Sequence, residues 1–280
     1  MSSSGAALVV RPPAVAGLFY PGDPAQLATQ LQQLLAAADA VRPARDEVSS
    51  PKAYILPHAG YIYSGPYAAL GYSEIAQQAD DIRHVVLLGP THRVAVRGLA
   101  LPGADALATP LGDVPVWADG AAQLAAFPQV GVSAAVHREE HSLEVHLPFL
   151  QTVLGDFDVL PLAVGMTLPE EVADVLDAVW GGAETLIVVS SDLSHYLPYQ
   201  QAQAVDAASL EQIMALGPAL GHDQACGASP ANGLLVAAAR RKLVPRQLGA
   251  GNSGDTAGDK SRVVGYCAIA FDENWAGEPG

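Results

Sequence analysis

The sequence predicts one α/β domain in which a central, mostly parallel or mixed β-sheet is flanked by helices. Short runs rich in β-branched residues alternate with longer runs rich in alanine and leucine, as in successive strand–helix units. The chain has 280 residues, of which 50% are hydrophobic, so it can bury a sizeable core. We therefore expect a single domain over residues 1–280.

The β-branched runs indicate the strands of this sheet. Their alternation with helical runs is the pattern expected of a sheet with helices on both faces. The predicted strands are residues 53–56, 84–88, 159–164, 185–189 and 263–271.

Capping residues and the spacing of leucines indicate the helices. Asp23 and Pro24 supply an N-cap side chain and a first-turn proline, ahead of leucines that recur at helical spacing. Thr167 and Glu170 form a capping-box pattern before a second amphipathic run. Further helices are predicted over residues 143–154, 199–216 and 229–242.

Two segments break this pattern. Residues 99–115 are rich in proline and glycine, and residues 249–259 read GAGNSGDTAGD. Strand and helix signals resume directly on both sides, so neither segment is a domain linker. We expect the second to form an ordered loop at the rim of a pocket.

The composition excludes several classes of partner. The chain carries 29 acidic and 14 basic side chains and a formal charge of −15, the wrong sign for a phosphate backbone, so we expect no nucleic acid. No apolar run has the length of a membrane span, and no basic segment precedes a hydrophobic stretch at the start. We therefore expect a cytoplasmic protein that does not bind membranes, and two cysteines form no disulfide framework.

Histidines follow three of the predicted strands. His58 follows residues 53–56, His92 follows residues 84–88, and His195 follows residues 185–189. Ligands of open α/β sheets bind at the carboxyl ends of strands, where these residues would meet. A single histidine is more often a structural residue, but neutral imidazole is also a common ligand of zinc, iron and copper. Recurrence at three equivalent positions favours a metal site.

Other polar residues near these strand ends have more than one interpretation. Asp192 could orient His195, bind the metal, assist proton transfer, or cap a helix that begins near Tyr196. His141 and His146 are five residues apart, which excludes the HExxH helix of zinc proteases. His146 lies beside an apolar stripe and is predicted to support a metal ligand or to be a buried structural group, rather than to bind the metal itself. His141 is expected to face the pocket and hydrogen-bond a substrate.

Cys226 stands at a glycine-containing turn that enters a predicted helix. A helix N-terminus lowers the pKa of a thiol and favours the thiolate, which is both a nucleophile and a metal ligand. Cys267 lies in an alternating strand and is predicted to be an inert hydrophobic residue. The motifs of the serine nucleophile elbow, the phosphate-binding loop and the dinucleotide-binding turn do not occur, so these functions lack support.

Seven motifs are spread over nearly the whole chain: RPPAVAGLFYPGDP, ILPHAGYIYSG, LLGPTHR, EEHSLEVHLPFL, SSDLSHY, ACGASP and NSGDTAGDKSRVVGY. Together they resemble those of the Memo family, which is labelled AmmeMemoRadiSam system protein B in bacteria. That family is similar in fold to the catalytic subunit of class III extradiol dioxygenases. In those enzymes two histidines and a glutamate hold a nonheme iron, and another histidine is the acid/base.

The resemblance implies a ligand set for this chain. His58 and His92 would be the two histidine ligands, Cys226 would replace the glutamate, and Asp192 and His195 would lie close to the metal. A thiolate is a softer ligand than a carboxylate and favours copper(I), zinc or iron.

The expected function is a mononuclear iron or copper protein with a redox site resembling that of a dioxygenase, with zinc as a further cofactor candidate. His195, Asp192 and His141 are the expected catalytic residues. One alternative is a module that binds a peptide or protein in the same cleft, and a second is a metal-dependent hydrolase. The expected ligand is a small molecule or a peptide, and the bacterial family name implies a functional link to a radical-SAM protein.

Overall fold

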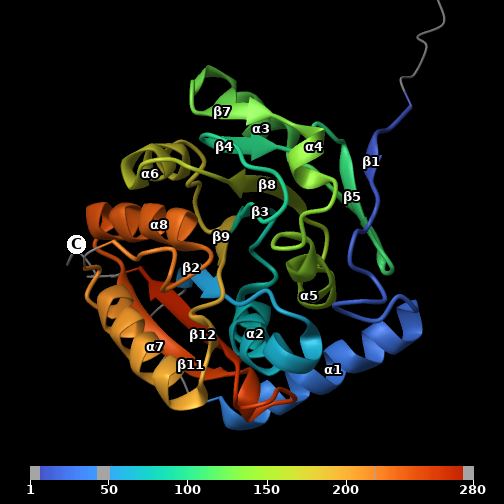
Figure 1. Ribbon diagram of the computed structural model, residues 1–280. Helices are drawn as coiled ribbons and strands as arrows, with labels where there is room; N and C mark the ends of the chain where they lie inside the picture. Colours follow the sequence, from blue (N-terminus) through green and yellow to red (C-terminus); the bar gives the residue numbers. More distant parts are fainter. Residues whose placement is uncertain (1–6, 43–50, 218, 274–280) are drawn as a thin grey trace, which may run out of the picture.

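A nine-stranded mixed sheet runs through the centre of the molecule (Figure 1). The computed structural model describes residues 7–42, 51–217 and 219–273. Four neighbouring parallel strands form the middle of the sheet, in the order β2 (Pro51–Leu56), β9 (Thr185–Ser190), β3 (His84–Pro90) and β8 (Asp158–Val164). Parallel pairing directs the carboxyl ends of these strands to one edge, where the predicted site residues follow.

Shorter or antiparallel strands complete this sheet on both sides. β12 (Val263–Asp272) pairs antiparallel with β2, and both β11 (Val244–Asn252) and β10 (His195–Leu197) pair antiparallel with β12. On the other side, β4 (Leu99–Leu101) is antiparallel to β8 and parallel to β7 (Val130–Val132). The fold-class prediction of an α/β domain with a mixed sheet is confirmed, and each of the five predicted strands lies within an observed one.

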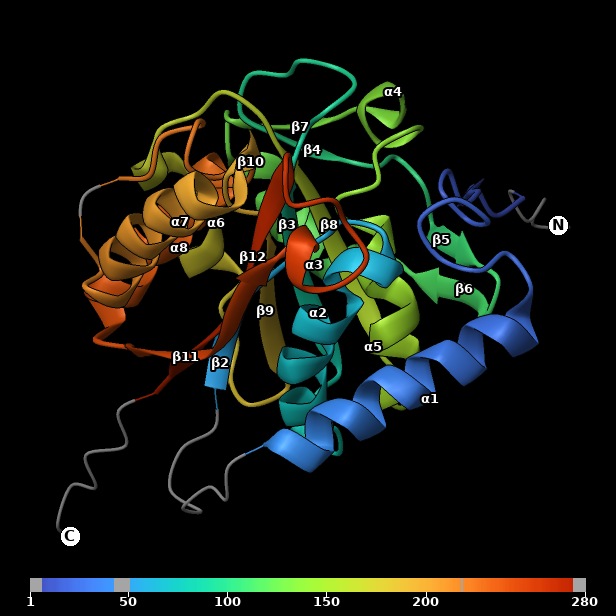
Figure 2. The same ribbon diagram turned by 60° about the horizontal axis from the view of Figure 1, so that its bottom comes forward.

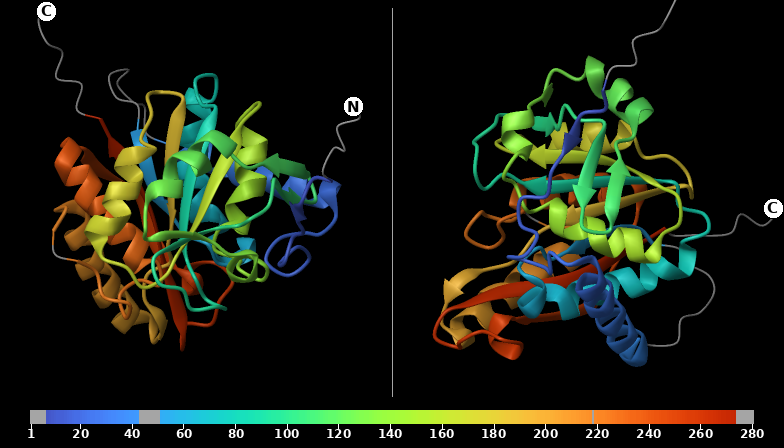
Figure 3. Two further views of the ribbon diagram at one scale, coloured as in Figure 1. Left: turned by 90° about the horizontal axis from the view of Figure 1, so that it is seen from above. Right: turned by 90° about the vertical axis from the view of Figure 1, so that its right-hand side faces the viewer.

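A separate three-stranded sheet contains β1 (Val10–Arg11), β5 (Ala106–Thr109) and β6 (Gly112–Pro115). Figure 3 shows this blue and green sheet on the side of the molecule opposite the orange helices. The segment 99–115, in which no strand was predicted, thus holds β4, β5 and β6.

Helices cover both faces of the central sheet (Figure 2). One core packs α1 (Pro24–Val41), α2 (Tyr61–Ile75) and α5 (Leu147–Val153), and the other packs α6 (Pro169–Ala178), α7 (Tyr199–Met214) and α8 (Ala228–Arg241). Successive residues of β2 alternate between the two cores, with Ile55 in one and Tyr54 in the other. The short helices are α3 (Ala118–Gln123), α4 (Ala134–His137), η1 (Ala76–Gln78), η2 (Leu124–Ala126), η3 (Glu144–His146) and η4 (Ser253–Asp255).

Two predicted helix starts need correction. The carboxylate of Glu171, rather than that of Glu170, accepts hydrogen bonds from the Leu168 backbone N–H and the Thr167 hydroxyl, so α6 begins at Pro169. The helix predicted from residue 143 begins at Leu147, after the turn η3. Pro148 explains this start, because proline is tolerated in a first helical turn but disrupts a helix interior.

The glycine-rich segment 249–259 is only in part the predicted loop, because residues 249–252 belong to β11. A Cβ atom at Gly251 would lie 2.0 Å from the Tyr67 hydroxyl of α2, and one at Gly249 would lie 2.4 Å from Leu70. Glycine therefore serves close packing of a helix on a strand, rather than loop flexibility. Among the helices of the described ranges, none combines the length and the apolar character that a bilayer crossing requires.

Candidate metal centre

Three neighbouring strands deliver polar residues to one edge of the sheet. His58 follows the end of β2, His92 follows the end of β3, and Asp192 follows the end of β9. Because β9 lies between β2 and β3, these residues are brought close together. His141 lies close to them but comes from the connection between α4 and η3, and it does not follow the end of a predicted strand.

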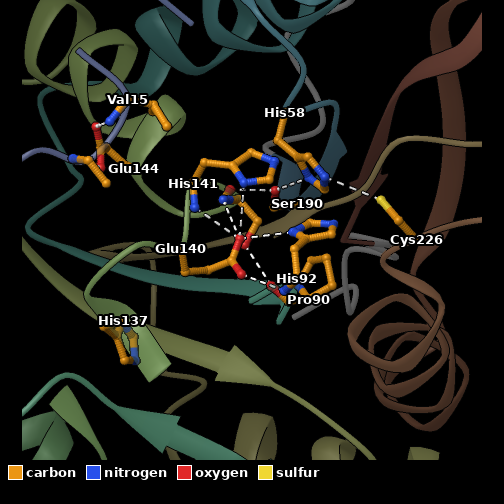
Figure 4. Close-up of polar contacts among 12 residues, drawn as sticks. Val15, His58, Pro90, His92, His137, Glu140, His141, Glu144, Ser190 and Cys226 are labelled. Carbon is orange, nitrogen blue, oxygen red and sulfur yellow. Dashed lines mark hydrogen bonds and ion pairs between the residues drawn. The ribbon is translucent and has the colours of Figure 1, made fainter. Parts of the chain in front are cut away.

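The imidazoles of His58, His92 and His141 form the core of the site. One ring nitrogen from each lies within 4.8 Å of those of the other two. Figure 4 shows the three rings gathered beside Ser190 and Glu140. The structure thus brings together the two histidines that the resemblance implies as ligands, and adds His141 to them.

Hydrogen bonds hold His58 with its Nε2 atom free of a proton. Ser190 donates its hydroxyl hydrogen to the Ser142 carbonyl at 2.6 Å, so its oxygen accepts from the Nδ1–H of His58, also at 2.6 Å. Burial and the neighbouring His141 lower the pKa of His58 well below its usual value, and the ring is only 2% exposed. His58 is therefore neutral and presents a lone pair, which is the form that binds a metal.

Glu140 plays the same part for His92. Its Oε1 atom lies 2.9 Å from Nδ1 of His92, and the carboxylate also accepts the backbone N–H groups of His92, His141 and Ser142. Burial acts to raise the pKa of Glu140, but the hydrogen bonds that it accepts from His92 and Ser142 lower it to about 2. The ionised carboxylate thus orients His92 with Nε2 directed away from it.

Sequence reasoning assigned Glu140 no role. The signal that could have found it is an acidic residue directly before a candidate histidine, because histidines that bind metals usually donate their other N–H to a carboxylate or a carbonyl.

His141 is held more loosely than the other two rings. Its Nδ1 atom lies 3.4 Å from Glu140, and the Phe19 ring packs on it with a centroid distance of 4.8 Å. Burial lowers the pKa of His141 to about 4, against the opposing charge of Glu140. This ring is therefore also neutral at physiological pH, and its expected catalytic role stays a prediction.

Cys226 lies on the other side of His58. Its sulfur is 3.2 Å from Nε2 of His58, where the S–H donates to the free lone pair. Burial and the charge of Asp192 raise the pKa of this thiol, so the predicted lowering by a helix N-terminus is wrong. Desolvation outweighs the backbone N–H groups at the start of α8. A Cβ atom at Gly227 would lie 2.5 Å from the Ser190 carbonyl, so glycine allows this turn to approach β9.

Asp192 and His195 lie beside this cluster without pairing to each other. Asp192 is 3% exposed and accepts the backbone N–H of His58 at 2.8 Å, and burial raises its pKa to about 7. It does not cap a helix near Tyr196, because β10 follows and α7 begins at Tyr199. Nδ1 of His195 donates instead to the Leu193 carbonyl at 2.8 Å, which leaves its Nε2 free to accept a proton. Their catalytic roles stay predictions.

The two remaining candidates are structural, as predicted. His146 is 1% exposed and bonds the Tyr72 hydroxyl through Nδ1 at 2.8 Å, and burial lowers its pKa to about 3. Cys267 is fully buried in β12.

The three imidazoles are spaced for a transition metal, whereas Cys226 stands outside their group and its sulfur contacts His58. Metal–sulfur and metal–nitrogen bonds of about 2.3 and 2.05 Å at angles of about 90–109° separate the two ligand atoms by about 3.1–3.6 Å. The Nε2–Sγ distance of 3.2 Å between His58 and Cys226 falls in this range. Nitrogens that share one ion can be at most about 4.2 Å apart, so the three imidazoles, spaced within 4.8 Å, need at most a small inward movement. Neutral imidazole nitrogens and a thiolate, which Cys226 becomes when a metal displaces its proton, suit zinc, iron or copper, whereas magnesium and calcium prefer oxygen.

The family model described as Memo-like protein matches residues 11–270. The chain belongs to this family. The resemblance predicted from its motifs is therefore confirmed.

Relatives of similar length support membership in the Memo-like family. A MEMO1 family protein of Aquifex aeolicus is 35% identical, over 94% of this chain and 99% of the relative. One of Ignicoccus hospitalis is 34% identical, also over 94% of this chain and 99% of the relative. Among solved structures, an uncharacterized protein of Escherichia coli K12 matches with a TM-score of 0.53 and 14% identity, over 79% of this chain and 99% of that one. At this identity the likeness shows the fold alone.

Proposed function

We propose that this Memo-like protein binds one iron or copper ion through His58, His92 and Cys226, and that the site performs redox chemistry on a small organic molecule. The observation that carries the proposal is the free Nε2 of His58, which Ser190 orients and which lies 3.2 Å from the Cys226 sulfur. His141 is a further donor, which lies in one group with His58 and His92. The sulfur ligand favours iron, copper or zinc over metals that require oxygen ligands.

The residues around the ligands have distinct tasks in this proposal. A bound ion would supply Lewis-acid and electron-transfer chemistry. His195 accepts or returns a proton at Nε2, because its Nδ1–H is engaged by the Leu193 carbonyl. Asp192 holds the His58 backbone in place through its Oδ1 atom. Ser190 and Glu140 keep two imidazoles in the orientation that presents Nε2.

The test is elemental analysis of protein purified without oxygen. We expect about one equivalent of iron or copper in the wild type, and its loss in the His58→Ala and Cys226→Ala variants. His84→Ala is the matched histidine control, because His84 begins β3 and pairs with Asp158 at the opposite end of the strand. Cys267→Ala is the cysteine control.

Other outcomes decide between the alternatives. Metal that survives Cys226→Ala but not His141→Ala would assign the site to the three histidines. Zinc in place of iron or copper, with product formed in the absence of oxygen, would favour the hydrolase. Failure of the wild type to bind iron, copper or zinc when they are offered would contradict the proposal and favour the peptide-binding module.

A further inference from the structure

A cavity of about 410 Å³ opens directly beside the proposed metal ligands, with His92 and Cys226 in its wall. This volume lies within the range of small-molecule sites. The segment that follows β3 forms one side, from Pro90 to Val96. The segment after β8 and the turn before α8 form the rest.

The charge of this cavity differs from that of the chain. The whole chain has 29 acidic and 14 basic side chains, yet no Asp or Glu lines this cavity. Four other cavities of the described residues each contain at least one carboxylate, from Asp81, Asp113, Glu170 and Asp206 respectively. A cavity whose wall carries a positive charge and no carboxylate favours an anion over a cation.

Arg93 is the permanent charge in this wall, and it makes no hydrogen bond or ion pair within the described part of the chain. Arg93 directly follows His92 in the chain and lines the same cavity, so this charge lies beside the metal cluster. Arg97, four residues further on, lies outside the cavity wall and its charge acts on Glu171 instead.

The remaining wall contains both apolar and polar side chains. Val94, Val96, Val164 and Met166 offer hydrophobic contact, whereas Ser229 and His222 offer hydrogen bonds. A guanidinium binds a carboxylate through two parallel N–H···O bonds, whereas phosphate sites usually gather several arginines. One arginine beside valines therefore suits one carboxylate on an apolar body.

We propose that this cavity binds a small organic carboxylate with an apolar body. Its carboxylate pairs with Arg93, and its body lies against the valines and reaches toward His92 and Cys226. The inference rests on the proposed function in naming the substrate class of that metal site, but binding at Arg93 can be measured separately.

The test measures the equilibrium binding of three related probes by calorimetry. Each carries a phenyl group on a short chain that ends in a different polar group. They are 3-phenylpropionate, the neutral 3-phenylpropionamide, and 2-phenylethyl phosphate. We expect the carboxylate to bind the wild type at millimolar concentration and to bind Arg93→Gln roughly five- to tenfold more weakly. Arg97→Gln is the matched control and should bind the carboxylate with the affinity of the wild type. The wild type should bind the neutral amide as weakly as Arg93→Gln binds the carboxylate.

Three comparisons of affinity could overturn the inference. They are equal affinity of the carboxylate for wild type and Arg93→Gln, equal affinity of the amide and the carboxylate for the wild type, and tighter binding of the phosphate. No saturable binding of the carboxylate by the wild type at millimolar concentration would overturn it as well. Metal content is measured on the same preparations: Arg93→Gln that retains metal but loses the carboxylate supports the inference, whereas wild type that binds carboxylate but no metal refutes only the metal proposal.

Discussion

Replacement of Glu140 by glutamine tests whether a buried carboxylate organises the metal cluster. Glutamine keeps the size of the side chain but removes its charge. In the wild type both carboxylate oxygens accept N–H groups, so the NH₂ group of glutamine would place a donor opposite a donor. The carboxylate is about 1% exposed, so solvent hardly screens these interactions.

The pKa of Glu140 gives the magnitude. Its lowering from 4.5 to about 2 corresponds to about 3 kcal/mol of stability at neutral pH. A carboxyl group with a lowered pKa stabilises the folded state above its unfolded pKa, and this contribution disappears as the pH falls from 4.5 toward 2. We therefore expect Glu140→Gln to lower the free energy of unfolding by about 3 kcal/mol at pH 7, and metal affinity by about 10- to 100-fold.

Urea denaturation followed by circular dichroism measures the first effect, and competition with a metal chelator measures the second. Glu139→Gln is the matched control, because Glu139 is exposed and should change stability by less than about 0.5 kcal/mol. The difference between wild type and Glu140→Gln should also shrink below pH 4.5. The reasoning is refuted if the two variants have the same stability and the same metal affinity at pH 7.

Three further substitutions test separate parts of the structure. Gly227→Ala should weaken metal binding and lower the free energy of unfolding by about 1–3 kcal/mol, because its Cβ would lie 2.5 Å from the Ser190 carbonyl. Chelator competition measures the metal affinity, and Gly131→Ala is the control because a Cβ there meets nothing within 4 Å. Burial lowers the pKa of His137 from 6.5 to about 4, so as the pH falls this side chain is protonated in the unfolded state before it is protonated in the folded state. The free energy of unfolding should therefore fall by about 3 kcal/mol between pH 6.5 and 4. Urea titrations at both ends of this window should show a flatter dependence for His137→Gln, and an unchanged slope would contradict the assignment. Tyr196 has a φ of 59° and is 62% exposed, so Tyr196→Gly should be more stable than Tyr196→Val by about 1–2 kcal/mol in the same assay, whereas equal stability would argue against strain there.

The central strands and most helix boundaries follow from local patterns in the sequence. Hydrophobic runs predicted β2, β3, β8, β9 and β12, and Asp23 caps α1 through the Gln26 N–H as predicted. The predictions for the segment 249–259 and for the start of the helix from residue 143 were wrong in part, because glycine and proline have other structural roles there. The glycines of β11 allow α2 to pack closely, and Pro148 delays the start of α5.

The sequence by itself determined that His58 and His92 follow buried strands, because hydrophobic periodicity locates strands and parallel strands end at one edge. Only the tertiary structure decided that Glu140 orients His92, that the Cys226 sulfur contacts His58, and that acidic residues stay out of the cavity at Arg93. Glu140 and His92 are 48 residues apart, and Cys226 and His58 are 168 residues apart, so no local sequence pattern encodes these contacts. The protonation of Cys226 likewise follows from burial among distant segments, because desolvation depends on what finally surrounds a group rather than on its neighbours in the chain.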